Sequence, residues 1–251
     1  MVLQLTRAEF LDEYFTYRPG EHASWIYPTQ RGKTHFAYQC LREAMRQQPQ
    51  LQVVSIMPKP NSPATARWAA ALGLCETPVW PPQRWPWQEK PAGYVLWPKH
   101  SRQLDAAANR ARVAAQIRKC LHAQYWAGNS ITLCDDVYIA AVLMGLNPEC
   151  EEHWTAGSEG GAGLWAPNQK PSGTLGGGSV SSFSYNSPVH LFLGKDTDDR
   201  NVRRFGEIGG VDPREVESIV RNLRLYAIDG KSISEVLYID KRGPYMALIG
   251  P

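Results

Sequence analysis

Apolar residues follow two patterns along the chain, short continuous runs and runs in which they recur every three or four positions. The second pattern predicts helices at residues 6–15, 35–48, 62–73, 104–127, 137–144, 198–206 and 213–222. The first predicts strands at residues 24–27, 51–58, 93–98, 130–136, 163–168 and 188–195. Because strands and helices alternate, we expect an α/β fold of three layers, with a mostly parallel sheet covered by helices on both faces.

Local signals mark where some of these elements begin and end. Thr6 and Glu9 have the spacing of a helix capping box. Residues 77–93 are too rich in proline for regular structure, and residues 172–188 are a Gly/Ser-rich stretch typical of a mobile loop. Near the end, two β-rich runs separated by glycine and charged residues predict a C-terminal β-hairpin.

Neither an internal repeat nor a convincing linker divides the sequence. We therefore expect a single domain over residues 1–251, with a core at about 20–215 and a β-rich C-terminal extension at about 223–251.

Composition narrows the functional classes only a little. The chain of 251 residues is 43% hydrophobic and 20% charged, as in ordinary soluble globular proteins. A net charge of +3 and a pI near 8.6 permit nucleic-acid binding without arguing for it. The N-terminus carries too many charges for a signal peptide, and no apolar run approaches the roughly 20 residues that a membrane span needs. We expect a cytoplasmic protein.

The cysteines support the same compartment. Five are present, an odd number, and none forms a CxxC pair: Cys40, Cys75, Cys120, Cys134 and Cys150. This pattern favours free, mostly buried thiols in a reducing environment over disulfides or a zinc site.

The strongest chemical signal is Gly32-Lys33-Thr34, which lies between an apolar strand and an amphipathic helix. A phosphate-binding loop needs this context, because backbone N–H groups and a helix N-terminus cradle the phosphates. The lysine then neutralises the outer phosphates and the threonine hydroxyl holds Mg²⁺. We expect ATP to contact residues Thr29, Gln30, Arg31, Gly32, Lys33, Thr34 and His35.

Two features leave this interpretation open. An ordinary strand-to-helix turn with a surface lysine would give the same tripeptide. Tyr27 also stands where the first glycine of the loop is expected, which affects the geometry of the loop and its affinity more than its identity.

A second element of an ATPase site follows the apolar run at residues 131–134, which ends in Asp135-Asp136. We expect Asp135 to assist Thr34 in holding Mg²⁺. Asp136 lies where many ATPases place a glutamate that orients the attacking water. Because aspartate is one methylene shorter, the water would have to lie closer, or hydrolysis would be slow. The alternative role for both acids is to cap the helix that follows.

Gln169 is a third candidate. It comes three residues after the apolar run Leu164-Trp165-Ala166, at the tip of the strand expected beside the acid-bearing one. A polar side chain there can sense the γ-phosphate and report its hydrolysis. The alternative is a simple polar turn.

The order of these motifs resembles that of the FtsK–HerA superfamily of DNA-pumping P-loop ATPases. Residues 166–172, Ala-Pro-Asn-Gln-Lys-Pro-Ser, are similar to an Ala-Thr-Gln-Arg-Pro-Ser stretch in members related to FtsK. The next strand, the helix start at Asp199-Arg200 and the turn at Gly209-Gly210 continue in the same order. The similarity covers about residues 20–215 and departs from the family at Tyr27, Asp136 and Lys170.

This resemblance implies a P-loop NTPase of the additional-strand type that works as a homo-oligomeric ring and moves double-stranded DNA. It implies a compact packaging or transfer motor of a phage or mobile element, acting in the host cytoplasm if phage-encoded, with a portal or transfer-machinery protein as a possible partner. Ring motors place an arginine against the neighbouring subunit's nucleotide. Arg203 or Arg204 is our candidate in the region that also holds Arg200.

DNA contact would be non-specific and directed at the phosphate backbone. The loop at residues 172–187 and the basic helix at residues 104–127 are the two candidate surfaces. The basic residues of that helix are Arg110, Arg112, Arg118, Lys119 and His122. A solvated helix face is the alternative explanation for them.

Three functions remain at this point. The leading one is a Mg-ATP hydrolysing DNA motor. Tyr27 and Asp136 favour a second, an ATP-binding switch or assembly module with slow or no hydrolysis. A small-molecule kinase is the third, but the chain lacks the arginine-rich lid expected of one.

Overall fold

A single twisted sheet of ten strands organises the chain in a computed structural model, which describes residues 2–83, 90–169, 178–205, 208, 210–243 and 245–251. In sheet order the strands are β1 (Leu3–Thr6), β12 (Tyr245–Gly250), β11 (Val236–Asp240), β8 (His190–Gly194), β2 (Ala23–Ile26), β7 (Ala162–Asn168), β6 (Ser130–Cys134), β3 (Gln52–Ile56), β5 (Gly93–Leu96) and β4 (Leu74–Thr77). Strands β8 to β4 of this order are all parallel, and β11 is antiparallel to both of its neighbours. The mostly parallel α/β fold is as predicted.

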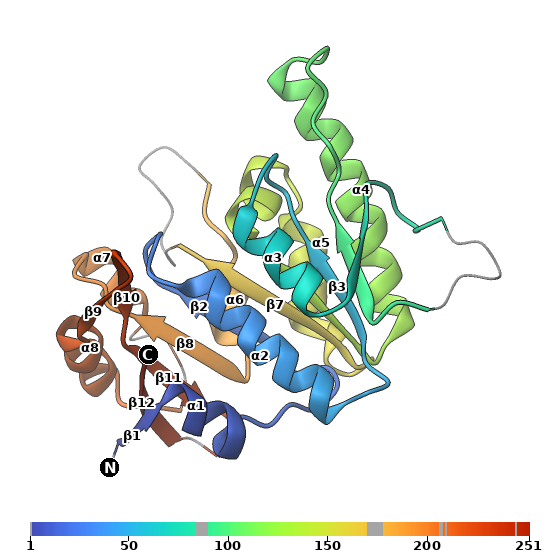
Figure 1. The fold of residues 1–251 in the computed structure, drawn as a ribbon. Coiled ribbons are helices and arrows are strands. Elements are labelled where there is room, and N and C mark those ends of the chain that lie inside the picture. Colours follow the sequence, from blue (N-terminus) through green and yellow to red (C-terminus); the bar gives the residue numbers. More distant parts are fainter. Residues whose placement is uncertain (1, 84–89, 170–177, 206–207, 209, 244) are drawn as a thin grey trace.

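Helices cover both faces of the sheet, which gives three layers (Figure 1). One face carries α1 (Arg7–Glu9), the π-helix η1 (Phe10–Tyr14), α2 (Lys33–Gln47) and α3 (Pro63–Ala71). The other carries α4 (Ala106–Ala127), η2 (Ile139–Leu143), α5 (Asn147–Glu152), η3 (His153–Gly157), α6 (Phe183–Asn186), α7 (Asp199–Phe205) and α8 (Pro213–Asn222). The first turns of α4 extend beyond the sheet.

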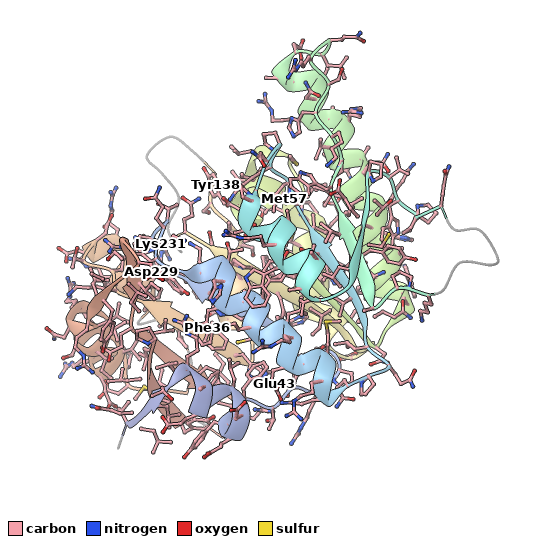
Figure 2. The ribbon with its side chains drawn as sticks, viewed as in Figure 1. Phe36, Glu43, Met57, Tyr138, Asp229 and Lys231 are labelled. Carbon is pink, nitrogen blue, oxygen red and sulfur yellow. The ribbon has the colours of Figure 1, made fainter. Side chains whose placement is uncertain are left out.

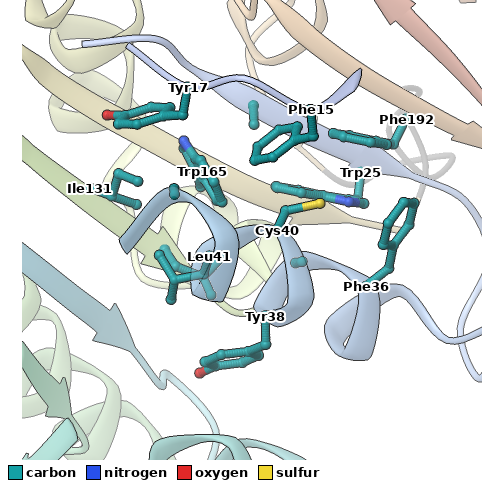
Figure 3. Close-up of a cluster of buried hydrophobic side chains, with 14 of the residues drawn as sticks. Phe15, Tyr17, Trp25, Phe36, Tyr38, Cys40, Leu41, Ile131, Trp165 and Phe192 are labelled. Atoms are coloured by element: carbon teal, nitrogen blue, oxygen red, sulfur yellow. The ribbon is translucent and has the colours of Figure 1, made fainter. Parts of the chain in front are cut away.

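An aromatic cluster fixes α2 on the central strands (Figure 3). Alternate residues of a strand point to the same face, so Trp25, Trp165 and Phe192 form one row across β2, β7 and β8. The rings of Trp25 and Phe192 are stacked with centroids 4.8 Å apart. Phe36 and Cys40 of α2 are fully buried against this row. This packing holds the first turn of α2 at the end of β2.

Several predicted elements are corrected or extended by the structure. The capping box of Thr6 and Glu9 is present, but the unpredicted strand β1 precedes it. A second unpredicted strand is β4, a short edge strand with two exposed residues. The predicted proline-rich irregular segment follows it. No helix was predicted between residues 144 and 163, where the structure has α5 and η3. Of the predicted loop at residues 172–188, residues 178–188 contain α6, and the rest lies outside the described residues.

The C-terminal extension is more elaborate than the one hairpin predicted. β9 (Leu225–Ile228) and β10 (Lys231–Ser234) pair as a separate two-stranded sheet. β11 and β12 instead extend the main sheet past β8. The β-rich end of the sequence therefore contains four strands in two antiparallel pairs, β9 with β10 in the small sheet and β11 with β12 in the large sheet.

Two further observations concern the chain as a whole. All five cysteines are free, and only Cys75 is exposed. Among the helices that the structure describes, none is both long and apolar enough to cross a membrane.

The order of the strands determines where the candidate residues meet. Parallel strands end at the same edge of a sheet, so the segments that follow β2, β7, β6 and β3 converge there. β7 lies between β2 and β6, as expected for an additional strand. The loop after β2, the acids after β6 and Gln169 after β7 are thus brought to one edge.

Candidate nucleotide-binding site

The loop between β2 and α2 has the conformation of an anion cradle. Gln30 and Gly32 adopt left-handed backbone angles, with φ of 59° and 86°. Lys33 begins a helix of 15 residues, whose first N–H groups point toward the loop. The Lys33 ammonium donates to the carbonyl oxygen of Tyr27 at 2.5 Å. Burial lowers the pKa of Lys33 to about 8, although the charges of Asp136 and Asp135 act in the opposite direction.

Tyr27, the departure from the usual loop, is accommodated by a glycine on the neighbouring strand. Its side chain is fully buried, and burial raises its pKa. A Cβ atom at Gly194, the last residue of β8, would lie 2.4 Å from both Cβ and Cγ of Tyr27. The tyrosine therefore occupies the volume that a side chain at position 194 would need. The Lys33 ammonium lies 5.4 Å from the centroid of the Tyr27 ring.

Asp135 connects the loop to α3. Its Oδ1 accepts a hydrogen bond from the Thr34 hydroxyl at 3.0 Å, and its Oδ2 accepts one from the Thr65 hydroxyl at 3.0 Å. Thr65 was not predicted, and its only local signal is its place in the first turn of α3, where it also bonds to the Ser62 cap. The Thr34–Asp135 contact places together the two residues predicted to hold Mg²⁺.

The donor set fits Mg²⁺, which prefers oxygen ligands and keeps waters and substrate phosphates beside one or two carboxylates. In the part of the chain that the structure describes, no group of three or more His, Cys, Asp and Glu side chains is arranged to hold a metal ion. A bound Mg²⁺ would therefore depend on the oxygen atoms of Thr34 and Asp135 together with nucleotide phosphates.

Asp136 is held by two side chains from other segments. Its Oδ2 lies 2.9 Å from the Lys59 ammonium and accepts a hydrogen bond from Gln169 Nε2 at 3.0 Å. Its Oδ1 is buried and has no hydrogen-bond partner among the described residues. The backbone of Asp136 is left-handed, with φ of 74°, a conformation that costs a non-glycine residue free energy and is concentrated at functional sites.

Lys59 is the functional candidate that sequence reasoning missed. Burial acts to lower its pKa, but the hydrogen bond and charge of Asp136 outweigh this, so the pKa is raised. The available signal was its position, three residues after the end of β3. Both acids accept hydrogen bonds from side chains of distant segments, whereas a helix cap accepts from nearby backbone N–H groups. The helix-capping alternative does not describe their contacts.

The other predicted residues lie at varying distances from this cluster. Thr29 and Gln30 are exposed in the loop. The Arg31 guanidinium donates to the Ser232 hydroxyl, and His35 Nδ1 accepts from Trp68 Nε1 at 3.2 Å.

The predicted basic residues do not join the cluster within this chain. Arg203 and Arg204 are exposed in the last turn of α7, which follows β8 on the opposite side of β2 from the acids. Arg200 lies 3.5 Å from the carboxylate of Asp198. On α4, Arg118 is paired with Glu149, whereas Arg110 and Arg112 are exposed near its start.

Comparison with known proteins bears on the fold. No protein-family model matches the chain, and no curated protein matches it in sequence. The structure is similar to the genome packaging NTPase B204 from Sulfolobus turreted icosahedral virus 2 in complex with sulfate, with a TM-score of 0.61 and 11% identity over 94% of this chain and 98% of that one. For the complex of the same NTPase with AMPPCP the TM-score is 0.60, with 12% identity over 93% and 99% of the two chains.

A related protein gives the same result. B204, the DNA-packaging ATPase from Sulfolobus turreted icosahedral virus, matches with a TM-score of 0.59 and 13% identity over 94% of this chain and 99% of that one. The chain therefore has the fold of these packaging NTPases. The predicted three-layer P-loop NTPase architecture is confirmed.

Proposed function

We propose that the protein is a Mg-ATP hydrolysing motor subunit that moves double-stranded DNA. One observation carries this proposal: the contacts Thr34–Asp135 and Gln169–Asp136, each of 3.0 Å, join three segments that are far apart in the sequence. A surface lysine in an ordinary turn would not require such partners. The fold shared with a DNA-packaging ATPase supports the same class of activity.

Each side chain in the cluster has a role in this proposal. Lys33 neutralises the outer phosphates, and the oxygen atoms of Thr34 and Asp135 would hold Mg²⁺, which would offset negative charge on the phosphates when bound. Asp136 Oδ1 accepts a hydrogen bond from the attacking water and orients it in line with the γ-phosphate. Gln169 contacts both Asp136 and the terminal phosphate, so it transmits the state of hydrolysis to β7.

The DNA surface in this proposal is the part of α4 that extends beyond the sheet (Figure 1). Arg110 and Arg112 are exposed there, and Arg102 is exposed in the segment before it. Exposed guanidinium groups bind backbone phosphates without reading sequence. In a ring of identical subunits, Arg203 or Arg204 would reach the nucleotide of the neighbour, and a portal or transfer-machinery protein would dock the ring.

The test is ATP hydrolysis by the purified protein with Mg²⁺, with and without double-stranded DNA, beside Lys33→Ala and Asp136→Asn. We expect DNA to stimulate turnover and both variants to abolish it, while Asp136→Asn still binds ATP. Absence of nucleotide binding by the wild-type protein would overturn the proposal.

The contacts of Asp136 with Lys59 and Gln169 favour a second candidate function, an ATP-binding switch. Both Lys59 and Gln169 occupy its Oδ2, and the ion pair with Lys59 competes for the carboxylate that must orient water. A switch that binds ATP and hydrolyses it slowly would have this arrangement. Lys59→Met separates the two functions, with Lys99→Met as the control because its ion pair with Glu76 is exposed. Faster basal turnover in Lys59→Met alone would support the switch, and unchanged or slower turnover would count against it.

A further inference from the structure

The small β9–β10 sheet lies directly against the candidate phosphate loop. Ser234 N donates to the carbonyl oxygen of Arg31 at 3.4 Å, and the Arg31 guanidinium bonds to Ser232. Cγ2 of Ile233 is 3.5 Å from the position of a Cβ atom at Gly32. The hairpin thus contacts the two loop residues that precede Lys33, although about 200 residues separate them in the sequence.

One face of this hairpin combines aromatic, apolar and cationic side chains. Ile233 pairs with Tyr226 and Lys231 pairs with Ile228, and such cross-strand pairs point to the same face. None of these four side chains is buried. Because Ile233 reaches Gly32, this face continues from the loop to the hairpin turn.

The hairpin is held in a defined position. Arg224, which precedes β9, forms an ion pair of 2.9 Å with Glu235, which follows β10. At the other end, Asp229 and Gly230 both have left-handed backbones, with φ of 49° and 70°, as a two-residue hairpin turn requires. The Arg224 guanidinium lies 5.6 Å from the centroid of the Tyr226 ring.

The strand order indicates which way a nucleotide would lie across the site. Asp135, Asp136 and Gln169 lie on the β7–β6 side of β2, so the terminal phosphate and the metal belong there. The hairpin emerges between α8 and β11 on the opposite side, next to β8. Lys231 lies beside the start of α2, where its charge lowers the pKa of His35 after the larger effects of burial and Arg7 (Figure 2). The ribose and base of a nucleotide therefore extend toward the hairpin.

We propose that the hairpin face formed by Tyr226, Ile228, Lys231 and Ile233 is the nucleoside subsite of the site. The Tyr226 ring and the two isoleucine side chains pack on the planar base. The contact is favourable because it removes the apolar surfaces of the base and of these half-exposed side chains from water. Lys231 meets the phosphate nearest the ribose. This inference rests on the proposed function, since it requires a nucleotide whose phosphates occupy the loop.

The experiment compares two ligands by calorimetry, Mg-ATP and Mg-tripolyphosphate, the second of which has phosphates but no nucleoside. In Tyr226→Ala we expect the affinity for ATP to fall about tenfold, with little change for tripolyphosphate. Lys231→Ala should weaken both ligands, because tripolyphosphate also carries a phosphate at the position that Lys231 meets. Leu225→Ala is the matched control, because Leu225 is exposed on the opposite face of the same strand. It should leave both affinities unchanged.

The outcomes separate this inference from the proposed function. If the wild-type protein binds neither ligand, the proposed function fails. If it binds both and the Tyr226 and Lys231 variants bind ATP as well as the wild type does, the subsite alone is refuted. Equal weakening of both ligands by Tyr226→Ala also refutes it, because the hairpin then only supports the loop.

Discussion

Replacing Gly194 by alanine introduces a methyl group at the contact between β8 and Tyr27. The added Cβ would lie 2.4 Å from two carbon atoms of the buried tyrosine, well inside van der Waals contact. Overpacking of a core typically costs 1–3 kcal/mol, and the closeness of this contact puts the expected loss at about 3 kcal/mol. Because the backbone carbonyl of the displaced Tyr27 accepts the hydrogen bond from Lys33, we also expect weaker ATP binding.

The pairing can be isolated by a double-mutant cycle. Tyr27→Gly removes both contacting atoms and costs about 3–5 kcal/mol by itself, as for other buried aromatic side chains. In that background Gly194→Ala should change the free energy of unfolding by only about 0.5 kcal/mol. The expected coupling between positions 27 and 194 is therefore about 2.5 kcal/mol, measured from urea midpoints at constant m-value.

Gly243→Ala is the control, because a Cβ atom there would meet nothing within 4 Å. It should leave stability and ATP binding unchanged. If the effects at positions 27 and 194 add to within about 0.5 kcal/mol, the proposed accommodation of Tyr27 by Gly194 is wrong.

Three further predictions follow from charges buried in the structure. Lys33→Met should abolish ATP binding yet raise the free energy of unfolding at pH 7 by up to about 3 kcal/mol, because burial lowers the pKa of Lys33 to about 8; an equal or lower urea midpoint would contradict this. Burial also lowers the pKa of His22 to about 3, so between that value and its ordinary 6.5 the unfolded chain binds more protons and stability falls on acidification, by about 2 kcal/mol at pH 5. His22→Asn should flatten this dependence in urea unfolding measured from pH 8 to pH 5, and an unchanged slope would exclude His22 as its source. Arg242→Met leaves the buried carboxylate of Asp240 without its partner and should cost about 3–5 kcal/mol, whereas Arg200→Met, whose ion pair is exposed, should cost less than about 1 kcal/mol; similar losses in the two variants would refute the argument.

The main architecture was predictable because its signals are local. Each central strand is a short apolar run and each long helix has a regular apolar face, so their alternation is enough to indicate a parallel sheet. The loop at Gly32-Lys33-Thr34 and the acids Asp135 and Asp136 were identifiable in the same way, since the loop lies between a strand and a helix and the acids directly follow a strand.

The remaining parts depend on contacts between distant segments. Nothing near Lys59 or Thr65 in the sequence indicates that each meets an acid some 70 residues away. Gly194 gives no sign that it makes room for Tyr27, because the pairing exists only once β8 lies beside β2. The strands β1 and β4 were missed for another reason. Both are edge strands in which exposed residues interrupt the apolar run, whereas the equally short β2 and β5 contain no exposed residue.

The pairing of β1 with β12 constrains the order in which this sheet can be completed. β1 pairs in register with β12, so that Leu3 lies opposite Ala247 and Thr6 opposite Gly250. During synthesis the first strand therefore emerges from the ribosome long before its partner exists. Residues 3–6 must remain unpaired while β2 to β8 assemble, and they dock only after β11 has reversed the direction of the chain and β12 has followed it. A chain truncated before residue 245 would lack β12 and would leave β11 as an open edge of the sheet.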